Sequence, residues 1–412
     1  MDFQTRIPLS SSTSFVVAMV LASIFALVLS KTLRSDTEAL QALRRSIDPN
    51  MIPPSSYISS WDFSVDPCDS TGAKFLGILC SNPEDNMTNR IVSIELDNAG
   101  YDGFLTHNIG NLTELTSLDL SRNQFRGPLP DTLKNLKKLT MLSISGNFFT
   151  GGIAGWIDGL KNIESIDLSE NLLSGPIPMR ISELRRLTRM NLANNEFSGR
   201  IPDINGLWKL DTLDLGSNMF VGSLPKLPTK LRSLTLSHNQ LSGRITELGS
   251  LNELRHIDLS DKFTGSISRS ILSLPSLNQL NVSFNQLTSI ELYNHLGSSS
   301  PLQVLNVQRN RLQGHLPVGL VNFENLQVIN LAYNGLTGRI PLAYGQRLGR
   351  PWRSLFLDDN FLSGHIPRQF NSSSLRISGN LGNNCLNCPM RIPICGGGQR
   401  PASACISEIG NR

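Results

Sequence analysis

Charged residues are scarce in this sequence. Lysine, arginine, aspartate and glutamate make up 17% of the 412 residues, and the formal net charge is only +4. The basic excess is not gathered into runs, which argues against a nucleic-acid-binding protein because such proteins concentrate positive charge. No protein-kinase motif is present, and no second long apolar run follows residue 29. The polar residues 396–412 predict neither a C-terminal membrane span nor a lipid-anchor signal.

The one long apolar run lies near the N-terminus. It extends from Phe15 to Leu29, is interrupted only by Ser23 and follows Arg6. The run is shorter than the roughly 20 residues that a membrane-spanning helix needs, and the small Ser30 after it fits a cleavage site. We therefore predict a cleaved signal peptide over residues 1–30 and a secreted mature protein without a membrane span. The alternative is an uncleaved N-terminal anchor in the plasma membrane.

Cysteine is absent from residues 81–384, and the six cysteines lie on either side of this gap. Secreted proteins place disulfides where the core is thinnest, so we expect disulfide caps at both ends. The four C-terminal cysteines allow three pairings that the sequence cannot rank. A metal or redox role for the Cys-x-x-Cys spacing is disfavoured because no histidine is nearby. The cysteines are Cys68, Cys80, Cys385, Cys388, Cys395 and Cys405.

Four sequons agree with the secretory route, because N-glycosylation acts on Asn-x-Ser/Thr sites of secreted chains. The predicted glycosylation sites are Asn86, Asn111, Asn281 and Asn371.

An internal repeat dominates the sequence. From Leu112 the chain follows the pattern L-x-x-L-x-x-L-x-L-x-x-N-x-F-x-G-P-L-P, and most copies are 24 residues apart. An opening copy has Ala99 where the asparagine is expected. We count about thirteen units, the last a fragment, over residues 90–382. The recurrent asparagines are Asn123, Asn147, Asn171, Asn195, Asn218, Asn239, Asn285, Asn310, Asn334, Asn360 and Asn380.

Each repeated residue has a structural role. The L-x-L core alternates with a period of two, so Leu118 and Leu120 point inward and Asp119 points outward. Stacked turns then share one continuous core. The asparagine amide can bond to backbone groups of its own and adjacent turns, the glycine permits a positive φ, and the proline keeps the following backbone out of a continuous sheet. These residues indicate an architecture and no function.

The segments that flank the array are predicted to cap it. Over residues 31–89, the segment Ser-Asp-Thr-Glu at 35–38 reads as a helix capping box, and Pro49 should end that helix. Trp61 and the turn before Cys68 complete this N-terminal cap. Residues 383–412 form a cysteine-rich C-terminal cap and tail. Both caps are needed because the end of a solenoid would expose its apolar core.

Two motifs carry a family resemblance. The stretch from Asp36 to Cys80, which ends Phe-x-Gly-Ile-x-Cys, resembles the plant-type cap that precedes leucine-rich repeats. The ending Gly-x-Ile-Pro, found at 175–178, 199–202, 338–341 and 364–367, is similar to the plant-specific repeat class. That class includes receptor-like proteins, receptor-kinase ectodomains and polygalacturonase inhibitors. The resemblance implies an α/β repeat fold: a right-handed superhelical leucine-rich-repeat solenoid with a parallel concave β-sheet and disulfide caps at both ends.

The sequence departs from this family pattern in places. Polygalacturonase inhibitors usually have about ten repeats and four cysteines in the N-terminal cap, whereas this cap has two cysteines. The eighth unit is one residue short and lacks the asparagine, which predicts a loosened turn at Asp261 and Lys262. No long island interrupts the array, which argues against a pocket of the steroid-hormone-receptor type.

Binding must use the positions that the repeat leaves free. Units nine to twelve place aromatic, arginine and valine side chains at positions expected to be exposed on the concave face, and aromatics and arginine are enriched in interface hot spots. A glycan at Asn281 would narrow this surface, and Asp358, Asp359 and Arg353 would add a polar edge. The predicted partner-binding residues are Phe284, Val304, Arg309, Val328, Tyr333 and Phe356.

We therefore expect a non-catalytic extracellular recognition protein of the apoplast or cell wall. It would bind a peptide or a receptor ectodomain, a membrane receptor kinase being one candidate, in signalling or defence. The column of Asp119, Asp167, Asp214 and Asp258 is read as solvated repeat positions and not as a catalytic pair. No cofactor, metal or nucleic acid is expected. The alternatives are an inhibitor of cell-wall-degrading hydrolases and a matrix-associated structural protein.

Overall fold

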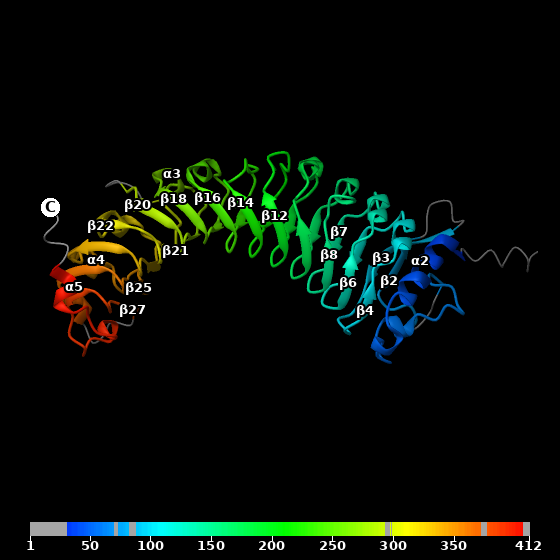
Figure 1. Ribbon diagram of the computed structural model, residues 1–412, viewed down its shortest axis with the longest axis horizontal. Coiled ribbons are helices and arrows are strands. Elements are labelled where there is room, and N and C mark those ends of the chain that lie inside the picture. The colour runs from blue at the N-terminus through cyan, green and yellow to red at the C-terminus, as the bar shows by residue number, and fades with distance from the viewer. Residues whose placement is uncertain are drawn as a thin grey trace, which may run out of the picture.

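The computed structural model describes residues 31–69, 73–81, 88–292, 297, 299–371 and 377–406. The chain forms a long arc of stacked turns, with short helices such as α3 along its outer rim (Figure 1). This is the expected leucine-rich-repeat solenoid. The predicted signal peptide, residues 1–30, and the sequon at Asn86 lie outside the described residues.

One parallel sheet of consecutive turns lines the inner curve of the arc. Within the described residues it has fifteen strands, and β2 alone among them joins it antiparallel. The register is constant, so Leu118, Leu142 and Ile166 follow one another in a buried column. The strands are β1 (Lys31–Thr32), β2 (Ile78–Ser81), β3 (Thr88–Glu95), β5 (Ser117–Asp119), β7 (Met141–Ser143), β9 (Ser165–Asp167), β11 (Arg189–Asn191), β13 (Thr212–Asp214), β15 (Ser233–Thr235), β17 (His256–Asp258), β19 (Gln279–Asn281), β21 (Val304–Asn306), β23 (Val328–Asn330), β25 (Ser354–Phe356) and β27 (Ser378–Asn380).

Two further parallel sheets run along one flank, which the sequence analysis did not foresee. The segment after most ladder asparagines pairs with its equivalent in the next turn. Its phenylalanines stack inside, as Phe125 and Phe149 do with ring centroids 6.0 Å apart. The strands are β4 (Asp102–Phe104), β6 (Gln124–Pro128), β8 (Phe148–Gly151), β10 (Leu172–Gly175), β12 (Glu196–Arg200), β14 (Met219–Gly222), β16 (Gln240–Gly243), β18 (Lys262–Ile267) and β20 (Gln286–Ile290), then β22 (Gln313–His315), β24 (Gly335–Gly338), β26 (Phe361–His365) and β28 (Cys385–Asn387).

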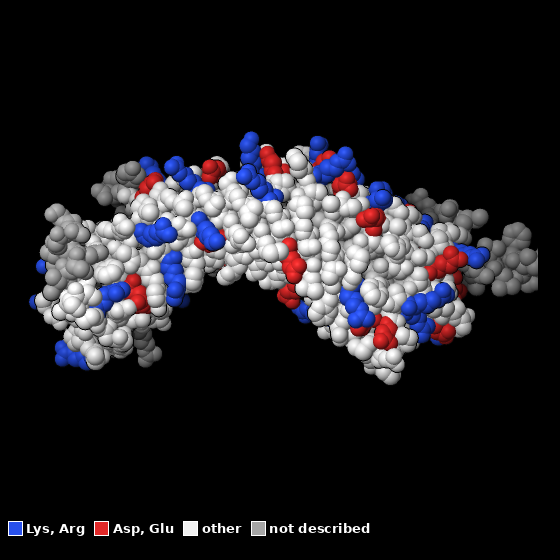
Figure 2. All heavy atoms as spheres, in the orientation of Figure 1, with Lys and Arg blue, Asp and Glu red and all other residues white. Residues whose placement is uncertain are grey.

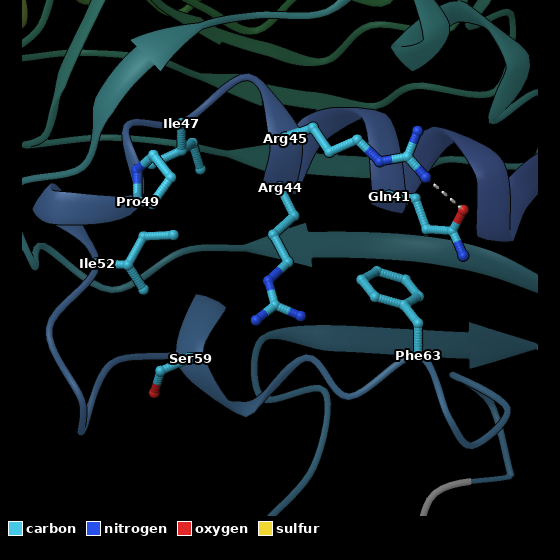
Figure 3. A pocket seen from close by; sticks show the side chains of 8 residues that line it. All are labelled: Gln41, Arg44, Arg45, Ile47, Pro49, Ile52, Ser59 and Phe63. Carbon is cyan, nitrogen blue, oxygen red and sulfur yellow. Dashed lines mark hydrogen bonds between the residues drawn. The ribbon is translucent and has the colours of Figure 1, made fainter.

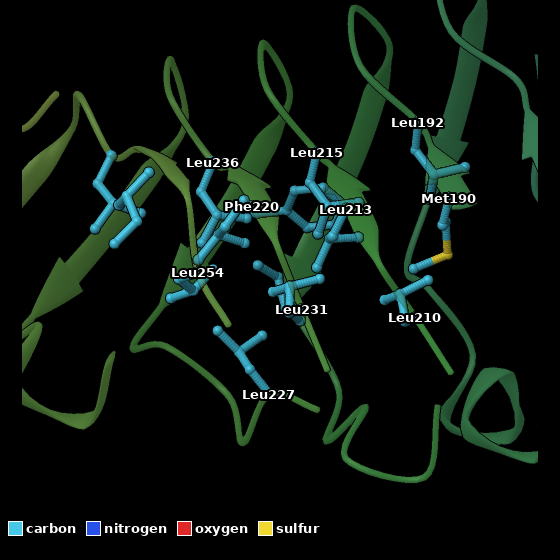
Figure 4. Close-up of a cluster of buried hydrophobic side chains, with 14 of the residues drawn as sticks. Met190, Leu192, Leu210, Leu213, Leu215, Phe220, Leu227, Leu231, Leu236 and Leu254 are labelled. Carbon is cyan, nitrogen blue, oxygen red and sulfur yellow. The ribbon is translucent and has the colours of Figure 1, made fainter. Parts of the chain in front are cut away.

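Short helices return most turns to the inner sheet. Leucines that precede the inner strands, such as Leu210 and Leu231, lie with Leu213 and Leu215 in the core (Figure 4). The α-helices are α2 (Arg34–Arg45), α3 (Arg269–Leu272), α4 (Leu342–Arg347) and α5 (Ala402–Ile406). The 3-10 helices are η1 (Pro49–Met51), η2 (Ile58–Ser60), η3 (His107–Asn111), η4 (Asp131–Asn135), η5 (Ile157–Gly159), η6 (Met179–Glu183), η7 (Thr246–Ser250), η8 (Val318–Asn322), η9 (Arg368–Asn371) and η10 (Pro393–Cys395).

Ten of the eleven repeated asparagines, from Asn123 to Asn360, form the expected hydrogen-bonded ladder. The Asn171 amide nitrogen donates to the carbonyl oxygens of Ile144, Leu168 and Ser169 at 3.0, 3.2 and 3.0 Å. Its oxygen accepts the backbone N–H of Phe149 at 3.0 Å. Each amide thus satisfies buried backbone groups of its own turn and of the preceding one.

The prediction for the last turn is wrong: Asn384 takes the ladder position there and donates to the carbonyls of Leu357, Leu381 and Gly382 at 2.9, 3.2 and 3.2 Å. Asn380 lies on β27, where its side-chain oxygen accepts the backbone N–H of Gly382.

The predicted capping box of the first helix is wrong. Helix α2 begins at Arg34 and has no side-chain cap at Leu33. Asp36 is instead fully buried and accepts hydrogen bonds from the Arg90 guanidinium and from the backbone N–H of Ile91 at 3.0 Å. The Asp36 carboxylate therefore forms a charge-assisted contact with Arg90 of the repeat array and does not cap the helix.

Disulfides close both caps. Cys68 pairs with Cys80 in the N-terminal cap. Of the three C-terminal pairings left open by the sequence, the structure has Cys385 with Cys405 and Cys388 with Cys395. The segment through η10 covers the end of the last turn, where the backbone N–H of Leu381 donates to the carbonyl of Ile394 at 2.7 Å.

The short eighth unit does not have the loosened turn that the sequence predicted. Asp261 is 8% exposed and takes the ladder position, where its carboxylate accepts the backbone N–H of Leu241 at 2.9 Å. The carbonyls of Leu236 and Leu259 still receive amide donors from neighbouring asparagines. The inner strands on both sides keep their register, and the irregular pairing lies further on, between Gly265 and Ser266 of β18.

We expect Asp261→Asn to stabilise the protein by about 1 kcal/mol, because an amide keeps the acceptor and adds two donors to the ladder. Burial raises the pKa of Asp261, so ionisation in the folded state is unfavourable and stability is lost as pH rises through that pKa. The gain should therefore be larger at pH 7.5 than at pH 4.5 in denaturant unfolding. The exposed Asp203→Asn is the control; an equal gain there would contradict the ladder explanation.

Candidate binding surface on the concave face

The predicted partner-binding residues do come together on the inner sheet. We call them the concave patch: Phe284, Val304, Arg309, Val328, Tyr333 and Phe356. Val304 and Val328 are in register on β21 and β23. Phe356 ends β25 in register with Asn330. The constant register of the repeat is what aligns positions about 24 residues apart in the sequence.

A stacked arginine forms the outer part of the patch. The Arg309 guanidinium lies 5.4 Å from the ring centroid of Phe284 and 4.3 Å from that of Tyr333. Both rings are well exposed, at 52% and 41%. Cation–π contacts on both faces hold the guanidinium in place and leave its edge free to donate hydrogen bonds. In the described part of the chain Arg309 has no ion-pair partner.

The backbone explains why these three side chains form a column. Phe284, Arg309 and Tyr333 all directly precede a ladder asparagine and have left-handed φ angles of 58°, 53° and 55°. Bulky residues rarely adopt this conformation, which costs on the order of 1–3 kcal/mol unless the surrounding structure imposes it. Here the ladder imposes it in successive turns. In the eighth unit, where one residue is missing, Ser260 directly precedes the ladder position and does not have a positive φ.

The inner part of the patch is less exposed than its sequence pattern predicts. Val304, Val328 and Phe356 are half-buried, because side chains on neighbouring strands, about 4.8 Å apart, cover one another. Val304 and Val328 lie side by side on their strands, five residues before Arg309 and Tyr333 in the sequence. Phe356 therefore contributes to packing as well as to the surface.

The polar edge is also different from the prediction. Asp358 is only 8% exposed, and its buried Oδ1 has no hydrogen-bond partner in the described structure. Asp359 accepts a hydrogen bond from Asn383, and neither carboxylate pairs with Arg353. Burial raises the pKa of Asp358, and the neighbouring charge of Asp359 raises it further.

We expect Asp358→Asn to reduce the loss of stability on going from pH 4.5 to pH 7.5. The folded protein holds the Asp358 proton more tightly than the unfolded chain, so this group contributes stability below its ordinary pKa of 3.8 that is lost as pH rises through the folded value. Denaturant midpoints at the two pH values measure the effect. An unchanged difference between the midpoints would show that Asp358 is solvated in the folded state.

The remaining sequons differ in their surroundings. Asn111 and Asn371 are exposed at the ends of 3-10 helices. Asn281 is half-buried on β19, and its side-chain oxygen accepts from the backbone N–H and hydroxyl of Ser283 at 3.2 and 2.8 Å. Its amide nitrogen would have to carry the sugar, and occupancy of all four sites stays a prediction.

The aspartates of the column stabilise the turns that follow their strands. The carboxylates of Asp119, Asp167, Asp214 and Asp258 each accept a backbone N–H two residues further on, at 2.9 to 3.3 Å. Burial raises the pKa of Asp214, with smaller contributions from its neighbours in the column. Among the described residues no cluster of three metal-ligating side chains occurs, and no helix there is long and apolar enough to span a membrane.

The charged residues are dispersed on the face that Figure 2 shows. Lysine and arginine alternate with aspartate and glutamate along the outer rim, with wide uncharged areas between them.

Family models match most of the chain. Residues 33–81 match the leucine rich repeat N-terminal domain, and residues 94–345 match the leucine-rich repeat region. The chain belongs to the leucine-rich repeat family. The matched region contains most of the ladder, most of the inner sheet and all of the concave patch except Phe356.

Curated relatives of this leucine-rich repeat protein include receptor-like proteins of Arabidopsis thaliana. It is 32% identical over 100 residues to receptor-like protein 31 and 29% identical over 141 residues to receptor-like protein 39. These matches cover 24% and 33% of this chain but only 12% and 16% of the relatives. The chain thus matches a small part of each relative.

Solved structures of similar fold include a plant peptide hormone receptor. The crystal structure of PEPR1 with AtPEP1 has a TM-score of 0.69 and 30% identity, covering 86% of this chain and 52% of that one. The plant peptide hormone receptor RGFR1 in complex with RGF2 has a TM-score of 0.62 and 26% identity, covering 73% and 58%. These relatives are receptor-like ectodomains, and the matches indicate no enzyme family.

Proposed function

We propose that this leucine-rich repeat protein is a non-catalytic extracellular recognition protein that binds a peptide or the ectodomain of a receptor, such as a receptor kinase, through its concave patch. The observation that carries the proposal is the Arg309 guanidinium, stacked between two exposed rings and without an ion-pair partner in the described chain. Aromatic and arginine anchors of this kind dominate binding energies.

Three further observations support the proposal. The half-buried valines give the patch an apolar part besides its polar, hydrogen-bonding groups, which is the usual anatomy of a protein interface. One structure of similar fold is that of the plant peptide hormone receptor RGFR1 in complex with RGF2. Three disulfides fit an oxidising extracellular location. We infer a role in signalling or defence from the receptor-like relatives.

Binding can be tested with the secreted full-length protein against two panels, one of receptor-kinase ectodomains and one of synthetic extracellular peptides. We expect Tyr333→Ala to weaken capture of the partner at least tenfold, because it removes one face of the arginine stack and an exposed aromatic anchor. Biolayer interferometry measures the loss, and thermal unfolding should change little.

The control is His238→Ala. His238 is exposed and lies at the equivalent left-handed position of an earlier unit, with φ of 58°. Equal capture by the Tyr333 variant would place the binding surface elsewhere. Inhibition of purified polygalacturonase, unaffected by Tyr333→Ala, would instead favour a hydrolase inhibitor.

A further inference from the structure

A groove in the N-terminal cap is separate from the concave patch. It has a volume of about 660 Å³ and lies between the C-terminal half of α2 and the segment through η1 and η2 (Figure 3). We call it the cap groove. Its lining residues are Gln41, Arg44, Arg45, Ile47, Pro49, Ile52, Ser59 and Phe63.

The cap groove carries uncompensated positive charge. Figure 3 shows the Arg44 guanidinium pointing into its centre, toward Ser59 and beside Phe63. One Arg44 N–H donates to the backbone carbonyl of Trp61, which fixes the side chain and leaves its other N–H groups available. The Arg45 guanidinium donates a hydrogen bond to the side-chain oxygen of Gln41 at 3.1 Å. In the described chain neither arginine forms an ion pair, and none of the eight lining residues is acidic.

The walls of the groove are apolar and rigid. Phe63 meets Phe75 edge to face, with ring centroids 5.2 Å apart, and Phe75 stacks on the fully buried Trp61 at 6.4 Å. On the other side, the backbone of Ile47 is bridged to Gly103 of the first turn. A site held in this way loses little conformational entropy when a ligand binds.

We propose that the cap groove binds a small organic carboxylate with a flat apolar body. Its volume is within the range typical of small-molecule sites, and these sites combine apolar walls with a few polar groups. The Arg44 guanidinium matches the two oxygens of a carboxylate, and Arg45 adds attraction for the negative charge. The flat body would lie against Phe63 on one side and Ile52 and Pro49 on the other.

Three probes separate the two parts of this proposal. Phenylacetate has both the charge and the ring, phenylacetamide has the ring without the charge, and acetate has the charge without the ring. We expect the full-length protein to bind phenylacetate at least tenfold more tightly than either of the others in ligand-observed NMR titrations. Equal binding of phenylacetate and acetate would overturn the proposal, as would tighter binding of an acidic pentapeptide than of phenylacetate.

Variants locate the binding site. Arg45→Gln should weaken phenylacetate binding severalfold, and Phe63→Ala should weaken phenylacetate and phenylacetamide alike. Arg44→Lys keeps the charge but not the paired donors, so it should lose most of the preference for the carboxylate while thermal unfolding confirms the fold. The control Arg34→Gln removes an exposed arginine of the same helix that pairs with Glu38.

Two results would contradict this location of the site: unchanged binding in all three groove variants, or an equal loss in the control. Tyr333→Ala, in the concave patch, should leave phenylacetate binding unchanged, so this proposal stands or falls independently of the proposed function.

Discussion

Replacing Asn171 by alanine should reduce the free energy of unfolding by about 3 kcal/mol. The substitution removes three donated hydrogen bonds and leaves the buried backbone N–H of Phe149 without its acceptor. The unpaired N–H makes the larger contribution, because the carbonyls of Ile144 and Leu168 keep donors from Asn147 and Asn195. Denaturant unfolding measures the loss, and hydrogen exchange should show faster opening around Phe149.

The control for this change is Asn162→Ala. Asn162 is half-buried, and its amide donates one solvent-exposed hydrogen bond to the carbonyl of Lys137 at 2.7 Å. We expect this variant to remain within about 0.5 kcal/mol of the parent protein. If both asparagine variants lost the same stability, the ladder would not be the source of the effect.

Replacing Arg309 by alanine should weaken partner binding about 30-fold or more, which corresponds to about 2 kcal/mol. Arg309 supplies the charge and the hydrogen-bond donors of the concave patch. Its removal also takes away the group that the rings of Phe284 and Tyr333 both contact. Arg309→Lys should recover little of the loss, because an ammonium group lacks the planar face that stacks between the rings. Interferometry with the captured partner measures both variants.

Arg311→Ala is the matched control for this prediction. Arg311 is also exposed and lies two residues further along the same turn, beyond the ladder asparagine and off the inner sheet. Its loss should leave binding within about threefold of the parent, since peripheral contacts contribute little. A similar loss from both arginine variants would indicate general electrostatic attraction and not the stacked anchor.

The repeat frame could be read from the sequence because its causes are local and recur. Leucines with a period of two and one asparagine per turn predict buried columns and a ladder, as Leu118 and Asn171 show. Contacts between residues far apart in the sequence could not be predicted in the same way. Asp36 fits a capping box locally, but Arg90, 54 residues away, binds its carboxylate in the fold. The C-terminal disulfide pairing depends on how the last turns are closed, which spacing alone does not determine.

The candidate site was predictable in position but not in geometry. Column alignment follows from the repeat and brings Phe284, Arg309 and Tyr333 together. Their left-handed backbone was not foreseen, since large side chains rarely adopt it. The available signal was that each directly precedes a ladder asparagine, as Asp359 also does. The half-burial of Val304 depends on neighbouring side chains and could not be inferred from one sequence.

Because each inner strand pairs with the next in the same way, the number of turns sets the distance between two sites on the protein. Excising one whole turn, for example residues 172–195, would join equivalent points of the frame and recreate the same contacts across the junction. The cap groove and the concave patch would then lie nearer by about one strand spacing of 4.8 Å, while the residues of each stayed the same. The distance between two sites on this protein can thus change without altering the chemistry of either.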